Sequence, residues 1–225
     1  MHRITKELLS KQDIDYKKFN GKIVSDTNYE MIGVRVPEIR NIVKTVVSRE
    51  DSYSFLKAEH FYYEEYLAHG LLISKIGDKE ETYALLDDFL PKIDNWAICD
   101  TVAMSIKKLA KDKKTLYEHI LIWLKSDRVY TVRFGIVCLL AYFTEKEYSD
   151  KIIAIISEMQ TDEYYINMAL AWLLSVMLVK NYDDYIKLIE SKTLPKFVQN
   201  KAIDKSRDSF RIGEEKKQYL KTFKI

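Results

Sequence analysis

An indole and a carboxylate stand four residues apart in a nearly apolar segment, NWAICDTVAMSIKKL, which begins at Asn95. If this segment is helical, Trp96 and Asp100 project from the same face, because residues four apart are neighbours on a helix. A ring face beside a negative charge can hold a cationic ligand. Structural roles are the alternatives: Asp100 could serve the helix dipole behind a cap at Asp94 or Asn95, and Trp96 could belong to the core.

Trp172 and Arg133 lie in two other apolar segments, NMALAWLL and VYTVRFGIVCLL. Core packing is the ordinary explanation of a tryptophan such as Trp172. An arginine in a buried helix needs a partner, and either an acidic side chain or a phosphate group meets that need. Arg133 is therefore a candidate phosphate ligand.

The carboxyl-terminal segment FVQNKAIDKSRDSFR concentrates positive charge. Lys201 and Lys205 are one helical turn apart. The other cations of this cluster are Lys192, Lys196, Arg207 and Arg211. Together they form a candidate phosphate-contact surface, although a solvated charged face is the ordinary explanation for any one of them.

Other catalytic patterns are absent from the sequence. It has no glycine-rich phosphate loop, no nucleophile elbow and no metal-ligand spacing among its four histidines and two cysteines. Cys99 and Cys138 both lie in apolar segments, which indicates buried, reduced thiols rather than a disulfide framework. We therefore expect neither a metal nor another cofactor.

The segments that carry these residues follow a repeat. Aromatic residues recur at the expected helix starts with a spacing of 33 to 35 residues: Phe61, Trp96, Tyr130, Tyr164 and Phe197. Each is followed by an apolar segment, a short polar break and a second amphipathic segment, such as KTLYEHILIWLK. Each repeat is therefore predicted to be a helical hairpin.

Paired helices with a period in the mid-thirties indicate an α-solenoid, in which neighbouring pairs bury faces that a single pair leaves exposed. We predict one all-α domain over residues 1–225, with amino-terminal capping helices in 1–55 and about five helix pairs in 56–225. The alternative is an irregular helical bundle with accidental aromatic spacing. Only three prolines and six glycines punctuate the chain, which favours helices over a β-sandwich or barrel.

Stacked hairpins would align the fourth and eighth positions after each leading aromatic along one surface. Those positions, with Arg133 from the third repeat, hold Glu65, His69, Asp100, Met104, Arg133, Met168, Trp172, Lys201 and Lys205. Such a mixture of acids, aromatics and cations differs from a uniform core. We therefore predict a groove along this surface.

Composition narrows the class of protein. With 47% hydrophobic residues, 31% charged residues and a net charge of +2, the chain is typical of a globular protein. The charge balance argues against coating a polyanion by bulk charge, but it is compatible with a local basic stripe. The first residues lack the apolar core of a signal peptide, and the longest nearly apolar run is shorter than a bilayer span. We expect a soluble, cytoplasmic monomer.

Five blocks of the chain resemble, in order and spacing, those of the AlkD-like DNA alkylation repair proteins. The blocks are GVRVPEIR (33–40), DNWAICD (94–100), VRFGIV (132–137), NMALAWLL (167–174) and NKAIDKSRDSFRIGEEK (200–216). The resemblance implies a right-handed solenoid of HEAT-like antiparallel helix pairs whose concave face binds duplex DNA. It also implies excision of cationic N3- or N7-alkylated purines by hydrolysis of the N-glycosidic bond, without a base-flipping pocket.

The resemblance further implies roles for individual residues. Asp100 takes the position of the family's catalytic aspartate, and Trp96 and Trp172 take those of two tryptophans that flank the lesion. Arg133 takes the place of an arginine close to the DNA backbone. The other residues expected to contact DNA are Arg35, Arg40, Lys201 and Lys205.

Some positions depart from the family pattern. Members often carry a basic residue three positions after the second tryptophan, where this chain has Ser175, and Met168 also replaces a residue that is often basic. The amino-terminal aromatic that approaches the lesion has no clear equivalent, because Val24 falls near its place. Two alternatives to a glycosylase therefore stay open: a paralogue that binds DNA structures without base excision, and a protein-interaction scaffold.

Overall fold

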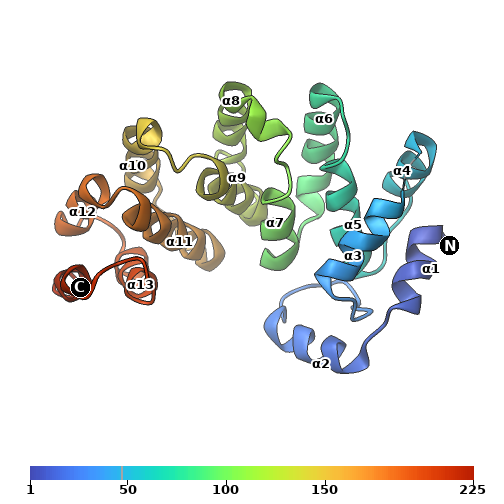
Figure 1. Cartoon of the computed structure of the whole chain (residues 1–225), viewed down its shortest axis with the longest axis horizontal. Helices are drawn as coiled ribbons and strands as arrows, with labels where there is room; N and C mark the ends of the chain where they lie inside the picture. Colours follow the sequence, from blue (N-terminus) through green and yellow to red (C-terminus); the bar gives the residue numbers. More distant parts are fainter. Residues whose placement is uncertain (47) are drawn as a thin grey trace. The chain divides into compact units, whose positions relative to one another are not determined.

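The computed structural model describes residues 1–46 and 48–225, and within them the protein is all-helical, without a β-strand. The chain forms two compact units, Met1–Asp112 and Lys113–Ile225, and Figure 1 shows them along the colour gradient from blue to red. The prediction of an all-α fold is confirmed. The solenoid and its handedness stay predictions.

The first unit contains seven α-helices and two 3₁₀ helices among its described residues. They are α1 (Arg3–Ser10), α2 (Ile14–Ile23), α3 (Val36–Thr45), α4 (Arg49–Leu56), α5 (Tyr63–Ile73), α6 (Lys79–Phe89), η1 (Leu90–Lys92), α7 (Trp96–Ala103) and η2 (Leu109–Lys111). The expected capping segment, residues 1–55, thus corresponds to α1 through α4. Its capping role stays a prediction.

The second unit contains seven further α-helices and one 3₁₀ helix. They are α8 (Lys113–Trp123), α9 (Val129–Tyr142), η3 (Lys146–Tyr148), α10 (Ser149–Glu158), α11 (Tyr164–Lys180), α12 (Tyr182–Glu190), α13 (Lys196–Arg207) and α14 (Glu214–Lys221). Helix α11 packs between α9 and α13 and contacts both of them (Figure 1).

The leading aromatic residues mark helix starts, as predicted. Trp96 and Tyr164 are the first residues of α7 and α11, and Tyr130 and Phe197 are the second residues of α9 and α13. Phe61 lies two residues before α5. The second segment of each repeat is also helical, in α6, α8, α10 and α12. The sequence period therefore reports a regular succession of helices.

Helix α5 lies at the centre of the first unit and contacts α1, α3, α4, α6 and α7. All of its residues except Tyr66 are buried. Gly70 of α5 is a point of close approach, since a Cβ atom there would lie 2.3 Å from the Val102 side chain of α7 and 3.0 Å from the Phe89 side chain of α6. The missing side chain at residue 70 therefore sets how closely α7 packs on α5.

The segment between α2 and α3 is tied to α5 by Glu64. Its buried carboxylate accepts hydrogen bonds from the backbone amides of Ile32, Gly33 and Val34 at 2.8, 2.7 and 3.1 Å. Gly33 has a φ of 98°, and a Cβ atom there would lie 2.5 Å from the carbonyl oxygen of Asp13. The block GVRVPEIR therefore begins with glycine because backbone conformation and space both exclude a side chain.

Glu65 and His69 were expected on the groove surface, but the structure buries both side chains, each to 3% exposure. Glu65 accepts hydrogen bonds from the backbone amides of Phe61 and Tyr62 at 2.8 and 3.1 Å. His69 stacks on Phe89, with the ring centres 4.8 Å apart. The expectation was wrong here because α5 is enclosed by five other helices and has no broad free face.

Candidate nucleic-acid site

The start of α7 is fixed by Asn95, whose side chain is fully buried. The Asn95 side-chain oxygen accepts hydrogen bonds from the backbone amides of Ala97 and Ile98, both at 3.0 Å. These bonds satisfy two amides of the first turn, so Asn95 is the helix cap. Trp96 is therefore the first residue of a well-anchored helix.

Asp94 has a different task, because it binds a segment far away in the sequence. Its carboxylate accepts hydrogen bonds from the Thr27 hydroxyl at 3.0 Å and from the backbone amide of Asn28 at 2.6 Å. The Asn95 side-chain amide donates to the same carboxylate at 2.7 Å. Asp94 thus holds the segment after α2 against the start of α7.

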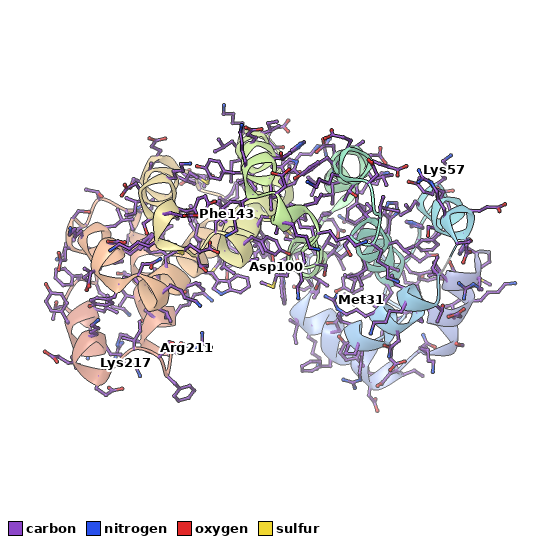
Figure 2. All side chains as sticks on the ribbon, turned by 45° about the horizontal axis from the view of Figure 1, so that its top comes forward. Met31, Lys57, Asp100, Phe143, Arg211 and Lys217 are labelled. Atoms are coloured by element: carbon purple, nitrogen blue, oxygen red, sulfur yellow. The ribbon has the colours of Figure 1, made fainter. Side chains whose placement is uncertain are left out.

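Trp96 and Asp100 are both half-buried and lie one turn apart on α7. Figure 2 shows Asp100 on α7, in the green part of the chain. Residues four apart share a helix face, so the structure places the indole and the carboxylate on the same side of the helix. Asn95 caps the helix start, so Asp100 is not the capping residue of α7. Its carboxylate lies one turn after Trp96.

The segment held by Asp94 also carries an aromatic residue that the sequence analysis did not select. The Tyr29 ring stacks on that of Tyr66, with the centres 3.8 Å apart, and its hydroxyl donates to the Lys92 carbonyl at 2.6 Å. Burial and the neighbouring Tyr66 raise the pKa of Tyr29. Val24, by contrast, is a core residue at 2% exposure. Tyr29, rather than Val24, is the half-buried aromatic of this segment.

Arg35 and Arg40 are exposed, and each also has a partner within the first unit. Arg35 forms a salt bridge with Asp13 at 3.1 Å, and its guanidinium lies 4.4 Å from the centre of the Tyr16 ring. A hydrogen bond from the Tyr16 amide, together with Arg35, lowers the pKa of Asp13. Arg40 donates to the Ser105 hydroxyl at 3.1 Å, next to the end of α7. Both arginines remain accessible to a ligand.

Arg133 lies in the interior of the second unit, at 6% exposure on α9. Its Nη1 group donates a hydrogen bond to the Tyr165 carbonyl at 2.8 Å, and its guanidinium lies 6.0 Å from the Tyr165 ring centre. One partner of this buried cation is therefore a backbone carbonyl at the start of α11. The contact ties α9 to α11.

Trp172 and Lys205 come together in the second unit. Trp172 is half-buried on α11, Lys205 is half-buried on α13, and both line one pocket. Lys201 lies one turn earlier on α13 and is also half-buried. Ser175, at the position that departs from the family pattern, is buried, and its hydroxyl donates to the Trp172 carbonyl at 2.7 Å.

The predicted site residues thus form two local groups. Trp96 and Asp100 share a face of α7 in the first unit, and Trp172 and Lys205 share a pocket in the second. Sequence reasoning missed Lys180, which lines the same pocket. Lys180 lies in the last turn of the apolar helix α11, and only the packing of α11 on α13 brings it to the pocket.

Across the part of the chain that the structure describes, helices of the length and apolar character needed to cross a bilayer are absent. In residues 1–46 and 48–225, histidine, cysteine, aspartate and glutamate side chains do not gather in threes that could hold a metal ion.

Fold and site together define an all-helical protein with tryptophans placed beside an acid in one unit and a lysine in the other. The family model described as DNA alkylation repair enzyme matches residues 4–205, and the chain belongs to that family. Membership supports a role in DNA repair and an interaction with DNA, in a family described as enzymes. No curated protein sequence matches the chain.

Proposed function

We propose that the protein is a DNA glycosylase that removes cationic N3- or N7-alkylated purines from duplex DNA by hydrolysing the N-glycosidic bond. The observation that carries the proposal is the pair of Trp96 and Asp100 on one face of α7, whose first turn is fixed by Asn95. A rigid helix start is the kind of support that a catalytic carboxylate needs. The resemblance of the chain to AlkD-like proteins points to the same residues.

The chemistry requires a negative charge close to the sugar. A purine alkylated at N3 or N7 carries a positive charge, so it leaves with the electrons of the broken C1′–N bond and becomes neutral. The deoxyribose then gains oxocarbenium character, which a fixed carboxylate stabilises. Asp100 would supply that charge and orient the water whose oxygen attacks C1′ and whose proton is released.

The tryptophans would act on the same positive charge. An indole face attracts a cation with about 0.5 to 2 kcal/mol, depending on how much water is excluded. Trp96 would contact the sugar beside Asp100, and Trp172 would flank the lesion from the second unit. Neither residue needs to grip the modified base, so this mechanism does not require a base-flipping pocket.

Five cations would hold the phosphate backbone. Arg35 and Arg40 are exposed in the first unit, and Lys201 and Lys205 are half-buried in the second. Arg133 would add positive charge near the backbone while its Nη1 group holds the Tyr165 carbonyl. We propose that these residues act on the concave face of a right-handed solenoid, in a monomeric, cytoplasmic protein.

Release of 7-methylguanine from alkylated duplex DNA tests the proposal directly. We expect release above the spontaneous rate, and its absence would refute the glycosylase activity. In Asp100→Asn, we expect excision to fall about a hundredfold while duplex binding stays nearly unchanged, because a lost transition-state charge affects the rate rather than binding. The matched control is Glu118→Gln, at an exposed position of α8. This variant should excise the base at the normal rate.

A second candidate function is DNA binding without base excision. It is favoured by α11, where the stretch from Met168 to Ser175 contains no cation and the Ser175 hydroxyl is occupied by the Trp172 carbonyl. Backbone contact on that side would then be weaker than in an efficient glycosylase. This candidate predicts salt-sensitive duplex binding with no base release, and the same assay distinguishes it.

A further inference from the structure

A pocket of about 410 Å³ opens in the second unit beside Trp172. Its lining comes from the second half of α11, from the end of α13 and from the segment after α13. Trp172, Val176 and Val179 supply its apolar lining. Ligand pockets range from roughly 300 to 1,000 Å³, so this volume suits one small molecule or one nucleotide unit.

Ser175 keeps this pocket open. Its side chain is small, buried to 5% exposure and directed by a 2.7 Å hydrogen bond to the Trp172 carbonyl. A long basic side chain at residue 175 would extend into the space that the serine leaves empty. The small side chain at residue 175 therefore leaves room for a ligand.

Positive charge exceeds negative charge in the pocket. Lys180, Lys205 and Arg211 line it together with a single carboxylate, Asp208. Among the described residues, none of the three cations forms an ion pair within 4 Å, although Lys180 is near enough to Glu145 to contribute to the lowered pKa of that carboxyl. The nearby acid on α13, Asp204, is already paired with Lys224 at 2.5 Å and with Arg207 at 4.0 Å.

Helix dipoles explain only part of this charge. Lys180 and Lys205 lie in the last turns of α11 and α13, where a cation is favoured by the helix dipole. Arg211 lies in the segment between α13 and α14, outside both helices, and Figure 2 shows it in the carboxyl-terminal part of the chain. The convergence of all three cations beside an indole indicates an anionic ligand with a ring.

We propose that this pocket binds a phosphate monoester carried by a nucleoside, from either a free nucleotide or the phosphorylated end of a DNA strand. A monoester carries a charge of about −1.5 to −2 at neutral pH, which suits three cations better than the single charge of an internal phosphodiester. The nucleobase or sugar would rest on the Trp172 indole, since ring stacking tolerates any base. Arg211 and Asp208 lie beyond the residues matched by the family model, and the proposal holds with or without base excision.

Calorimetric titration of the full chain with three probes tests the proposal. The probes are 2′-deoxyguanosine 5′-monophosphate, deoxyguanosine and inorganic phosphate. We expect the nucleotide to bind at least about tenfold more tightly than either part, because charge-assisted hydrogen bonds and stacking then act together. No binding of the nucleotide, or equal binding of the nucleotide and deoxyguanosine, would overturn the proposal.

Variants locate the ligand. Lys205→Gln and Arg211→Gln should each weaken nucleotide binding about tenfold, as expected for a lost hydrogen bond to a charged group. Trp172→Leu should reduce nucleotide affinity to that of inorganic phosphate. The control Lys187→Gln, at an exposed position of α12, should bind normally. An equal loss in the control would indicate attraction by bulk charge and would contradict the pocket.

A hairpin duplex that ends in a 5′-phosphate or a 5′-hydroxyl distinguishes the two sources. Tighter binding of the phosphorylated hairpin, lost in Arg211→Gln, would assign the pocket to strand ends. Nucleotide binding without any such preference would assign it to free nucleotides. Because these measurements need no base release, failure of the pocket and failure of the proposed glycosylase are seen separately.

Discussion

Asp94 accepts a 2.6 Å hydrogen bond from the backbone amide of Asn28 and so joins the residue before the α7 cap to the segment that follows α2. The same carboxylate binds the hydroxyl of Thr27 and the side-chain amide of Asn95. The position of Trp96 and Asp100 therefore depends on a segment nearly seventy residues earlier in the chain. Asp94 is a positioning residue for the candidate site.

Asp94→Ala should release Thr27 and Asn28 from the start of α7. We expect excision of 7-methylguanine to fall roughly tenfold through a lower maximal rate, because the geometry of Trp96 and Asp100 loosens. Hydrogen exchange at the Asn28 amide should become faster in the same variant. Unchanged exchange at this amide, or a normal rate of excision, would contradict the positioning role.

Gly33→Ala should lower the free energy of unfolding by about 1 to 3 kcal/mol, because an alanine is strained at positive φ and its Cβ atom would collide with the Asp13 carbonyl. Chemical denaturation measures the effect. Gly77→Ala is the matched control, since a Cβ atom there meets nothing within 4 Å. Equal effects of the two substitutions would show that the conformation of Gly33 is not the cause.

The buried pair of His60 and His69 should make stability depend on pH. Their ring nitrogens lie 2.8 Å apart, and burial lowers the pKa of both, that of His69 to about 3 with a further contribution from His60. Lys92 lowers both pKa values, whereas Glu65 raises that of His60 and Asp88 raises that of His69, without offsetting the effect of burial. Below about pH 6.5 the two histidines are therefore protonated in the unfolded chain but stay neutral in the folded chain. The free energy of unfolding then falls as the pH falls.

Between pH 6.5 and pH 5, His69 alone should cost roughly 2 kcal/mol of unfolding free energy, since one pKa unit corresponds to about 1.36 kcal/mol. Urea denaturation at several pH values measures this loss. His69→Gln should flatten the dependence in that interval, whatever its effect at neutral pH. An equally steep curve in the variant would place the origin elsewhere.

Arg133→Met should destabilise the second unit by about 1 to 3 kcal/mol, because the Tyr165 carbonyl loses its charged hydrogen-bond donor. If Arg133 also contacts a phosphate, the salt dependence of duplex binding should become less steep by about one unit in the variant. Thermal unfolding and binding titrations at several salt concentrations measure the two effects. A loss of stability with an unchanged salt slope would limit Arg133 to its structural role.

Much of the fold was predictable because its signals are local. Trp96, Tyr130, Tyr164 and Phe197 mark helix starts through a period that any stack of similar helices must repeat. The rings of Tyr164 and Phe197, the leading aromatic residues of two successive repeats, also contact each other, with centres 5.6 Å apart. Periodicity could not separate Glu65 and His69 from groove residues, because burial depends on how many helices surround α5.

The candidate site was less predictable because its partners are distant in the sequence. Asp94 and Asn95 are both residue types that cap helices. In the folded chain Asp94 binds Thr27 and Asn28, and Asn95 is the residue that caps α7. The partners expected for Arg133 were an acid or a phosphate, and the structure adds a backbone group, the Tyr165 carbonyl, to which its Nη1 group donates. Backbone groups carry no sequence signal, so such a partner appears only in the folded chain.

The close approach of α7 to α5 restricts the order in which two positions of this chain can be substituted. A Cβ atom at residue 70 would lie 2.3 Å from the Val102 side chain, so Gly70 cannot acquire a side chain while Val102 keeps its methyl groups. The reverse order is open, since a smaller residue at 102 leaves a cavity that an alanine at 70 can then fill. The two substitutions therefore have a preferred order, in which residue 102 becomes smaller before residue 70 gains a side chain.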